Sequence, residues 1–155
     1  MAPIAELSEP VLQKQFDVNV KSVAFGMKYQ IPLIIKQGGG SILNVASMAG
    51  LLAAPQMGAY AAAKHAVVGL TSTAAFEYGR ANIRVNAMCP YFTPTNIGDG
   101  FLKDEENAKN LSRGCPMKRI ARLDEIITAM LFAISPANSY MNGQTLAIDG
   151  GVSAI

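Results

Sequence analysis

The chain has 155 residues, half of them hydrophobic and only 15% charged, with 13 lysines and arginines against 11 aspartates and glutamates. A chain this apolar is not disordered, and its scattered basic residues argue against a nucleic-acid surface, which needs clustered cations. No stretch approaches the roughly 18 uncharged apolar residues of a membrane span, and the segment after Met1 lacks the pattern of a signal peptide.

The two cysteines, Cys89 and Cys115, form neither a CxxC pair nor a disulfide framework, so a reducing cytoplasm is the expected location. With a single histidine, His65, no metal site is expected. We interpret these three residues as a helix-surface imidazole and two small packed thiols. Because charged residues normally stay outside, the low charge predicts that another chain, or a missing part of the protein, covers some of the apolar surface.

The first predicted element is a long helix over 8–35, with Ser8 as its N-cap and Pro32 expected to kink or end it. Three glycines at 38–40 then break the chain. The short apolar run 41–46 predicts a strand of the kind that is buried on both faces of a parallel sheet.

A second helix is predicted over 59–78, with Gly79 as its stop. A strand over 82–88 follows, and then an irregular stretch rich in Pro, Thr and Gly over 89–100. A short polar helix is predicted over 103–112.

The clearest helix is predicted over 123–134, where the apolar residues form one stripe, and a last strand is predicted over 144–148. Helices and strands therefore alternate along the chain. This order predicts right-handed crossovers and a parallel sheet of three strands, an α/β fold in a single domain over 1–155.

Tyr60 and Lys64 are the first candidates for chemistry, because four residues separate them on one helix and place them on one face. A phenol, with an ordinary pKa of about 10, is a poor acid or base at neutral pH. A nearby ammonium favours the phenolate, so such a pair can exchange a proton with a carbonyl or an alcohol. An ordinary exposed Tyr–Lys pair has the same spacing.

Two more polar residues lie at informative positions. Ser47 follows the first predicted strand, at the edge where α/β proteins place their ligands. Asn19 lies in mid-helix between two valines, where asparagine is a mediocre helix former. The alternatives are an ordinary turn serine and a solvated helix position.

Asn19, Ser47, Tyr60 and Lys64 together resemble the catalytic tetrad of the short-chain dehydrogenase/reductase family. The surrounding segments are similar to those of the family as well, and they cover most of the chain: FDVNVK at 16–21, GSILNVAS at 40–47, YAAAKHAVVG at 60–69, IRVNAMCP at 83–90 and GQTLAIDGG at 143–151.

The resemblance implies a role for each member of the tetrad. Tyr60 would be the general acid/base, and Ser47 would hydrogen-bond the reacting carbonyl oxygen. Lys64 would favour the phenolate of Tyr60 and hold the nicotinamide ribose, and Asn19 would anchor a water of the proton relay. The implied substrate is a small-molecule carbonyl or alcohol.

The implied cofactor is NAD or NADP. The residues that would contact it are Tyr60, Lys64, Pro90, Phe92 and Thr95. The family fold is a seven-stranded, doubly wound, Rossmann-like parallel sheet, and its members are commonly homodimers or homotetramers that associate through the two long helices.

The chain also departs from the family. No glycine-rich turn follows a strand and opens a helix, and the glycines at 38–40 have the reverse order. We therefore expect the C-terminal half of such a protein, a partial Rossmann-like sheet of about three strands with flanking helices that lacks most of the cofactor cradle. Tyr91 stands where the family has a glycine, so its ring is expected beside the nicotinamide. Residues 99–112 correspond to the variable substrate lid.

Two alternatives to an NAD(P)-dependent oxidoreductase remain open. The chain could be a catalytically inactive, oligomerising relative or fragment that binds no cofactor. It could also catalyse hydrolysis or another cofactor-free proton transfer with Ser47, Tyr60 and Lys64, although no second base is evident beside Ser47.

Overall fold

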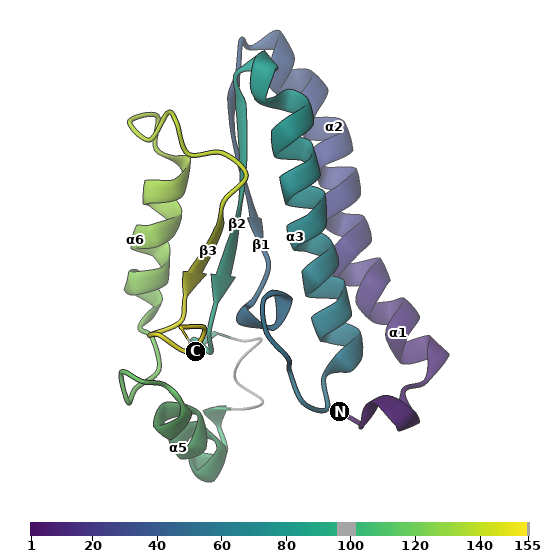
Figure 1. Cartoon of the computed structure of the whole chain (residues 1–155), viewed down its shortest axis with the longest axis vertical. Coiled ribbons are helices and arrows are strands. Elements are labelled where there is room, and N and C mark those ends of the chain that lie inside the picture. Colours follow the sequence, from purple (N-terminus) through teal and green to yellow (C-terminus); the bar gives the residue numbers. More distant parts are fainter. Residues whose placement is uncertain (96–101, 155) are drawn as a thin grey trace.

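The computed structural model describes residues 1–95 and 102–154 and shows an α/β fold around one parallel sheet. The strands lie in the order β1 (Gly40–Val45), β2 (Ile83–Pro90) and β3 (Thr145–Ile148). The main helices are α1 (Glu9–Gln15), α2 (Ser22–Lys36), α3 (Gly58–Tyr78), α5 (Glu105–Gly114) and α6 (Leu123–Ile134). The helices α2 and α3 cover one face of the sheet and α6 covers the other, as the alternating pattern predicts (Figure 1).

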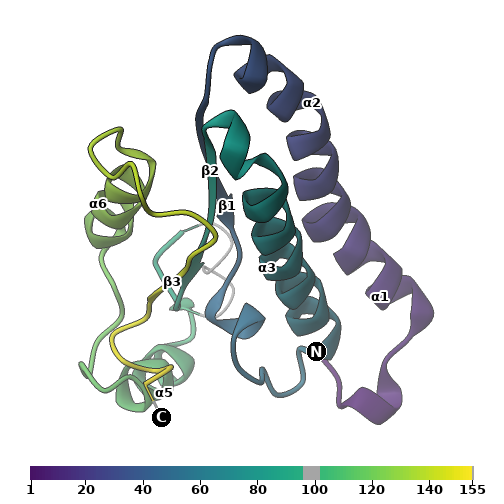
Figure 2. The ribbon, with the colours of Figure 1, turned by 45° about the horizontal axis from the view of Figure 1, so that its top comes forward.

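A single long helical rod precedes the sheet (Figure 2). It consists of α1, the π-helical segment η2 (Phe16–Lys21) and α2. Of the two expectations for Pro32, a kink or an end of the helix, the second is wrong, because α2 continues to Lys36. Proline removes one helix hydrogen bond, but Ile31 is buried in the core and Ile34 packs against it, so tertiary packing holds the helix together on both sides of Pro32.

Two turns meet at the amino ends of β1 and β2. One contains the glycines before β1, and the other contains Asn82 before β2. Gly38 and Gly39 have φ values of 87° and 125°, which end the helical rod and lead into β1 as expected. A Cβ on Gly39 would lie 2.5 Å from the carbonyl oxygen of Asn82, so the two turns are in backbone contact. The glycine run therefore has a packing role at the end of the sheet opposite Ser47.

The end of α3 agrees with the prediction, because the helix ends at Tyr78 and Gly79 is its C-cap. Gly79 keeps a right-handed φ of −58° and begins the short 3-10 helix η4 (Gly79–Ala81). The left-handed residue that turns the chain into β2 is Asn82, with φ of 58°. Asparagine tolerates this conformation because its short side chain can bond locally, here to the Gly38 carbonyl oxygen at 3.1 Å.

Small side chains bring α3 close to the sheet. Its buried residues are Ala59, Ala63, Val67, Thr71, Ala74 and Ala75. Met27 and Ile31 of α2 complete this side of the core against Ile42 and Val85. On β1, Ile42 and Asn44 are buried but Val45 is 46% exposed, so this strand is not buried on both faces as expected and lies at the edge of the described sheet.

Arg84 of β2 fixes the other helical layer. Its guanidinium donates to the carbonyl oxygens of Ala133, Ile134 and Ser135 at the end of α6, and to that of Met141 in the loop before β3. Cationic groups are favoured at helix C-termini. One side chain thus ties α6 and the entry to β3 onto the central strand. Among the helices described here, none is long and apolar enough to cross a membrane.

Candidate active site

Ser47 follows β1 directly and begins a tight turn. It is the N-cap of the 3-10 helix η3 (Met48–Gly50), and its Oγ accepts the Ala49 N–H at 3.2 Å. The Gly50 N–H donates to the Ser47 carbonyl oxygen at 2.8 Å. This turn holds Ser47 at the carboxyl end of the sheet, where open α/β proteins bind ligands.

Tyr60 and Lys64 lie one turn apart at the start of α3, and the structure brings their side chains together. The Lys64 Nζ lies 5.6 Å from the centroid of the Tyr60 ring, within the range of a cation–π interaction. The same ammonium donates to the Val45 carbonyl oxygen at 3.0 Å, which ties α3 to the end of β1. Burial lowers the pKa of Lys64, because desolvation disfavours its charged form.

The tetrad candidate Asn19 lies in the π-helical segment η2, which packs against α3. Its Nδ2 donates to the Gln15 carbonyl oxygen at 3.1 Å and to Gln15 Oε1 at 2.9 Å. Isolated π turns often occur at functional sites. The sequence did not predict this turn, although the two β-branched valines that flank Asn19 are a signal against regular helix packing.

Three of the proposed cofactor residues, Pro90, Phe92 and Thr95, lie at the end of β2 or just after it. Pro90 is the last residue of this strand and pairs with Ile148 of β3. Phe92 makes an edge-on ring contact with Tyr91 at a centroid distance of 5.1 Å, and Thr95 is exposed. The assignment of these residues to a cofactor stays a prediction, and residues 99–101 of the expected lid lie outside the described residues.

The side chain of Tyr91 lies on the side of α5, and its place beside a nicotinamide stays a prediction. Its hydroxyl donates to the Leu111 carbonyl oxygen of α5 at 3.4 Å, and its ring lines a cavity of about 130 Å³ together with Cys115 and Asp149. Burial raises the pKa of the Tyr91 phenol. The ring therefore lies between the strand ends and α5.

The sequence did not indicate that Gly50 and Cys89 pack around Ser47. Gly50 was interpreted only as a loop breaker, yet η3 packs against α3 at this residue. Cys89 is fully buried and packs in a cluster with Ala46, the residue before Ser47. Burial raises the pKa of this thiol. A glycine three residues after Ser47 was the available signal for close packing, whereas no pattern singled out Cys89.

The remaining candidates have structural roles. His65 is exposed and its Nδ1 lies 2.9 Å from the Ala61 carbonyl oxygen of its own helix. Cys115 is buried and its Sγ donates to the carbonyl oxygens of Asp149 and Gly150 at 3.6 Å. Both agree with the interpretation of the sequence.

Comparison with known proteins defines the class of this fold and site. The family described as enoyl-(acyl carrier protein) reductase matches residues 1–153. The short chain dehydrogenase/reductase astE of Aspergillus oryzae is 42% identical over 99% of this chain, and 3beta-hydroxysteroid dehydrogenase 2 of Eggerthella lenta is 41% identical over 99%.

A solved structure agrees with these sequence relatives. The gluconate 5-dehydrogenase of Burkholderia cenocepacia, in complex with NADP and tartrate, superimposes with a TM-score of 0.94 at 29% sequence identity, over 99% of this chain and 60% of that one. The chain belongs to the short-chain dehydrogenase/reductase family. It spans about 60% of the length of the curated relatives that it matches.

Proposed function

We propose that this chain contains the catalytic residues of an NAD(P)-dependent oxidoreductase that interconverts a carbonyl and an alcohol on a small molecule. The observation that carries the proposal is the Tyr60–Lys64 pair. The Lys64 ammonium lies 5.6 Å from the Tyr60 ring centroid and is fixed to the Val45 carbonyl oxygen at the carboxyl end of the sheet. An ammonium beside a phenol favours the phenolate and so helps it to exchange a proton.

The proposed roles follow from this placement. In carbonyl reduction, the Tyr60 hydroxyl gives its proton to the substrate oxygen, and in alcohol oxidation the phenolate takes it back. The Ser47 hydroxyl donates a hydrogen bond to the same oxygen and orients it. Asn19 anchors a water that returns the proton to Tyr60, since its segment packs against the helix of Tyr60.

The described residues fit one end of a nicotinamide dinucleotide. An ammonium has three donors, and Lys64 uses one of them on Val45, so two remain for the hydroxyls of a ribose. Pro90, Phe92 and Thr95 would flank the nicotinamide. A bound cofactor supplies or accepts the hydride. The glycine run at 38–40 lies at the opposite end of β1 and does not fit a pyrophosphate.

The test is to measure cofactor binding and turnover with a Tyr60→Phe variant. We expect the chain to bind NADH or NADPH in a fluorescence titration. In any carbonyl reduction that it catalyses, Tyr60→Phe should lose on the order of 100- to 10,000-fold in kcat. Tyr140→Phe is the matched control, because Tyr140 is fully exposed. Absence of binding at millimolar cofactor would favour the inactive relative instead.

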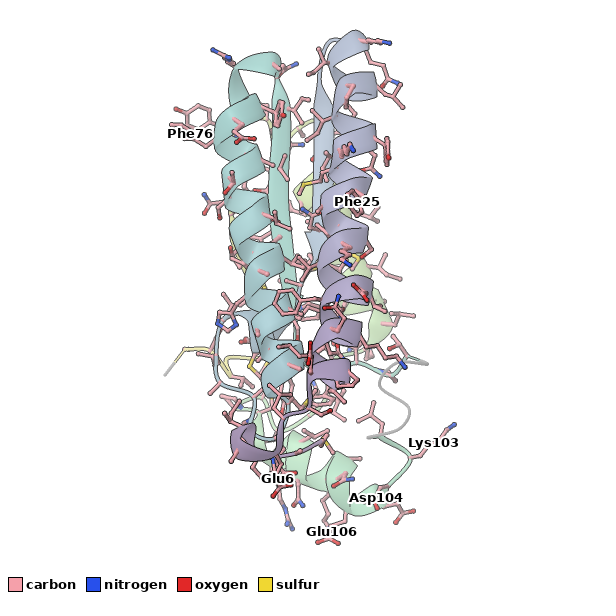
Figure 3. All side chains as sticks on the ribbon, turned by 90° about the vertical axis from the view of Figure 1, so that its right-hand side faces the viewer. Glu6, Phe25, Phe76, Lys103, Asp104 and Glu106 are labelled. Carbon is pink, nitrogen blue, oxygen red and sulfur yellow. The ribbon has the colours of Figure 1, made fainter. Side chains whose placement is uncertain are left out.

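We also propose that the chain forms a homodimer or homotetramer through α2 and α3. Phe25 and Tyr29 of α2 are 51% and 66% exposed, and Phe76 of α3 is 93% exposed (Figure 3). Exposed apolar side chains that lie together on a protein surface often mark an interaction site. Exposed apolar residues on these helices are also expected for an inactive, oligomerising relative. An oligomer would therefore not distinguish the enzyme from that alternative.

Analytical ultracentrifugation tests the assembly. We expect an oligomer for the unmodified chain, and dissociation when Phe25→Glu and Phe76→Glu are combined. Tyr140→Glu, which places the same charge on another surface, should leave the oligomer intact. A 16.4 kDa monomer of the unmodified chain at micromolar concentration would contradict the proposal.

A further inference from the structure

The turn that contains Ser47 lies directly on the backbone of α3, and Gly50 is the residue at the contact. Gly50 is buried. A Cβ built on it would lie 2.8 Å from the Lys64 carbonyl oxygen, 3.0 Å from the Lys64 carbonyl carbon and 3.3 Å from the Lys64 Cβ. Backbone atoms of a helix cannot swing aside as the end of a long side chain does. Any side chain at position 50 must therefore move either η3 or α3.

The same turn is held from the opposite side by β2. The Ala46 N–H donates to the Met88 carbonyl oxygen at 2.8 Å. Cys89 is fully buried in a cluster with Ala46 and Val67. The turn that contains Ser47 therefore packs between the buried thiol of Cys89 on β2 and the backbone of α3 at Lys64.

We propose that Gly50 and Cys89 are positioning residues that set the separation of Ser47 from Lys64, a role that rests on the function proposed above. Neither side chain supplies a reacting group. Gly50 sets the approach of η3 to α3 because it has no Cβ, and Cys89 sets the height of Ser47 above β2 because its buried side chain packs with Ala46, the residue before Ser47. A displacement of about 1 Å in such a site can lower the rate about 100-fold.

The first experiment compares Gly50→Ala with Gly69→Ala. Gly69 lies on α3 as well, but a Cβ built there meets nothing within 4 Å. The readout is the NMR signal of the Lys64 side chain in protein labelled with ¹³C and ¹⁵N at lysine, assigned by its loss in Lys64→Arg. We expect this signal to move in Gly50→Ala and to stay in place in Gly69→Ala.

Turnover provides a second readout where the chain is active. Gly50→Ala should lower kcat/KM about 100-fold, and Gly69→Ala should not change it. A folded Gly50→Ala variant with the Lys64 signal and kcat/KM of the unmodified chain overturns the proposal. If the unmodified chain has no turnover, the proposed function fails, and the Lys64 signal alone still decides whether Gly50 positions this residue.

The second experiment keeps the proposal testable if Gly50→Ala does not fold. Cys89→Ala removes the buried sulfur that packs with Ala46, whereas Cys89→Ser retains a side chain of similar size. We expect the amide resonance of Ser47 to shift and its hydrogen exchange to accelerate in Cys89→Ala, with recovery in Cys89→Ser. An unchanged Ser47 amide in the folded Cys89→Ala variant overturns the role of Cys89.

Discussion

The side-chain amide of Asn44 donates to Thr71 Oγ1 at 2.9 Å, and this polar contact joins β1 to α3 inside the core. The two residues are only 8% and 0% exposed. Thr71→Val keeps the shape of the side chain but leaves the Asn44 amide without its hydroxyl partner. We expect a loss of about 1–3 kcal/mol in the free energy of unfolding, measured by urea denaturation. Thr73→Val on the exposed side of the same helix should change it by less than about 0.5 kcal/mol.

Arg84 should be essential for the attachment of α6 to the sheet. Its guanidinium donates to the Ala133 carbonyl oxygen at 3.0 Å and to the Ser135 carbonyl oxygen at 3.1 Å. Lysine has the same charge but cannot reach several carbonyl groups in a plane. Arg84→Lys should therefore lower the free energy of unfolding by about 1.5–3 kcal/mol and accelerate amide exchange in α6. The exposed Arg80, replaced in the same way, is the control. Equal stabilities of the two variants would contradict the role of Arg84.

Stability should fall in acid because of Glu125. The Arg119 guanidinium makes two hydrogen bonds to this carboxylate, at 2.7 and 2.8 Å, and these bonds lower the pKa of Glu125 to about 2. The folded state thus binds the proton more weakly than the unfolded chain, whose carboxyl has the ordinary pKa of 4.5. The contribution is complete above pH 4.5 and is lost as the pH falls toward 2. Glu125→Gln should reduce this slope in denaturation curves, and Glu106→Gln should not.

Tyr91 should hold α5 against the strand ends. All residues of α5 are at least partly exposed, so few apolar contacts stabilise this helix. The Tyr91 hydroxyl donates to the Leu111 carbonyl oxygen at 3.4 Å. Tyr91→Gly removes both the ring and the hydrogen bond and should accelerate amide hydrogen exchange in α5 without affecting α3, whereas Tyr91→Phe, which keeps the ring but loses the bond to Leu111, should have a smaller effect. Equal exchange rates of α5 in all three proteins would show that other contacts hold it.

The periodic apolar segments predicted most of the fold. The sequence predicted both ends of the helix Leu123–Ile134 correctly, and it predicted the ends of the three strands to within two residues. The pattern is reliable here because burial on one face or on both faces decides which residues each element can contain. Local signals were less reliable. Pro32 is a helix breaker by propensity, but packing of Ile31 and Ile34 in the core overrides that propensity.

The site was less accessible to sequence reasoning than the fold. Spacing and family resemblance were enough to select Ser47, Tyr60 and Lys64 and to anticipate a Tyr60–Lys64 pair. They could not predict the direction of the Tyr91 ring, because that depends on which side of β2 faces α5. They also could not predict the contact of Gly50 with Lys64, since a contact between two backbones leaves no pattern except the absence of a side chain.

The small side chains on the inner face of α3 hold this helix close to the sheet, and Tyr60 and Lys64 lie near its start. Every buried position from Ala59 to Ala75 holds a residue no larger than valine or threonine. A larger residue at Ala75, which is only 4% exposed, would push the helix away from the sheet, because a packed core does not accept added volume without a shift. Tyr60 lies about four turns away on the same helix. We therefore expect added volume at Ala75 to change the angle of α3 and with it the position of Tyr60.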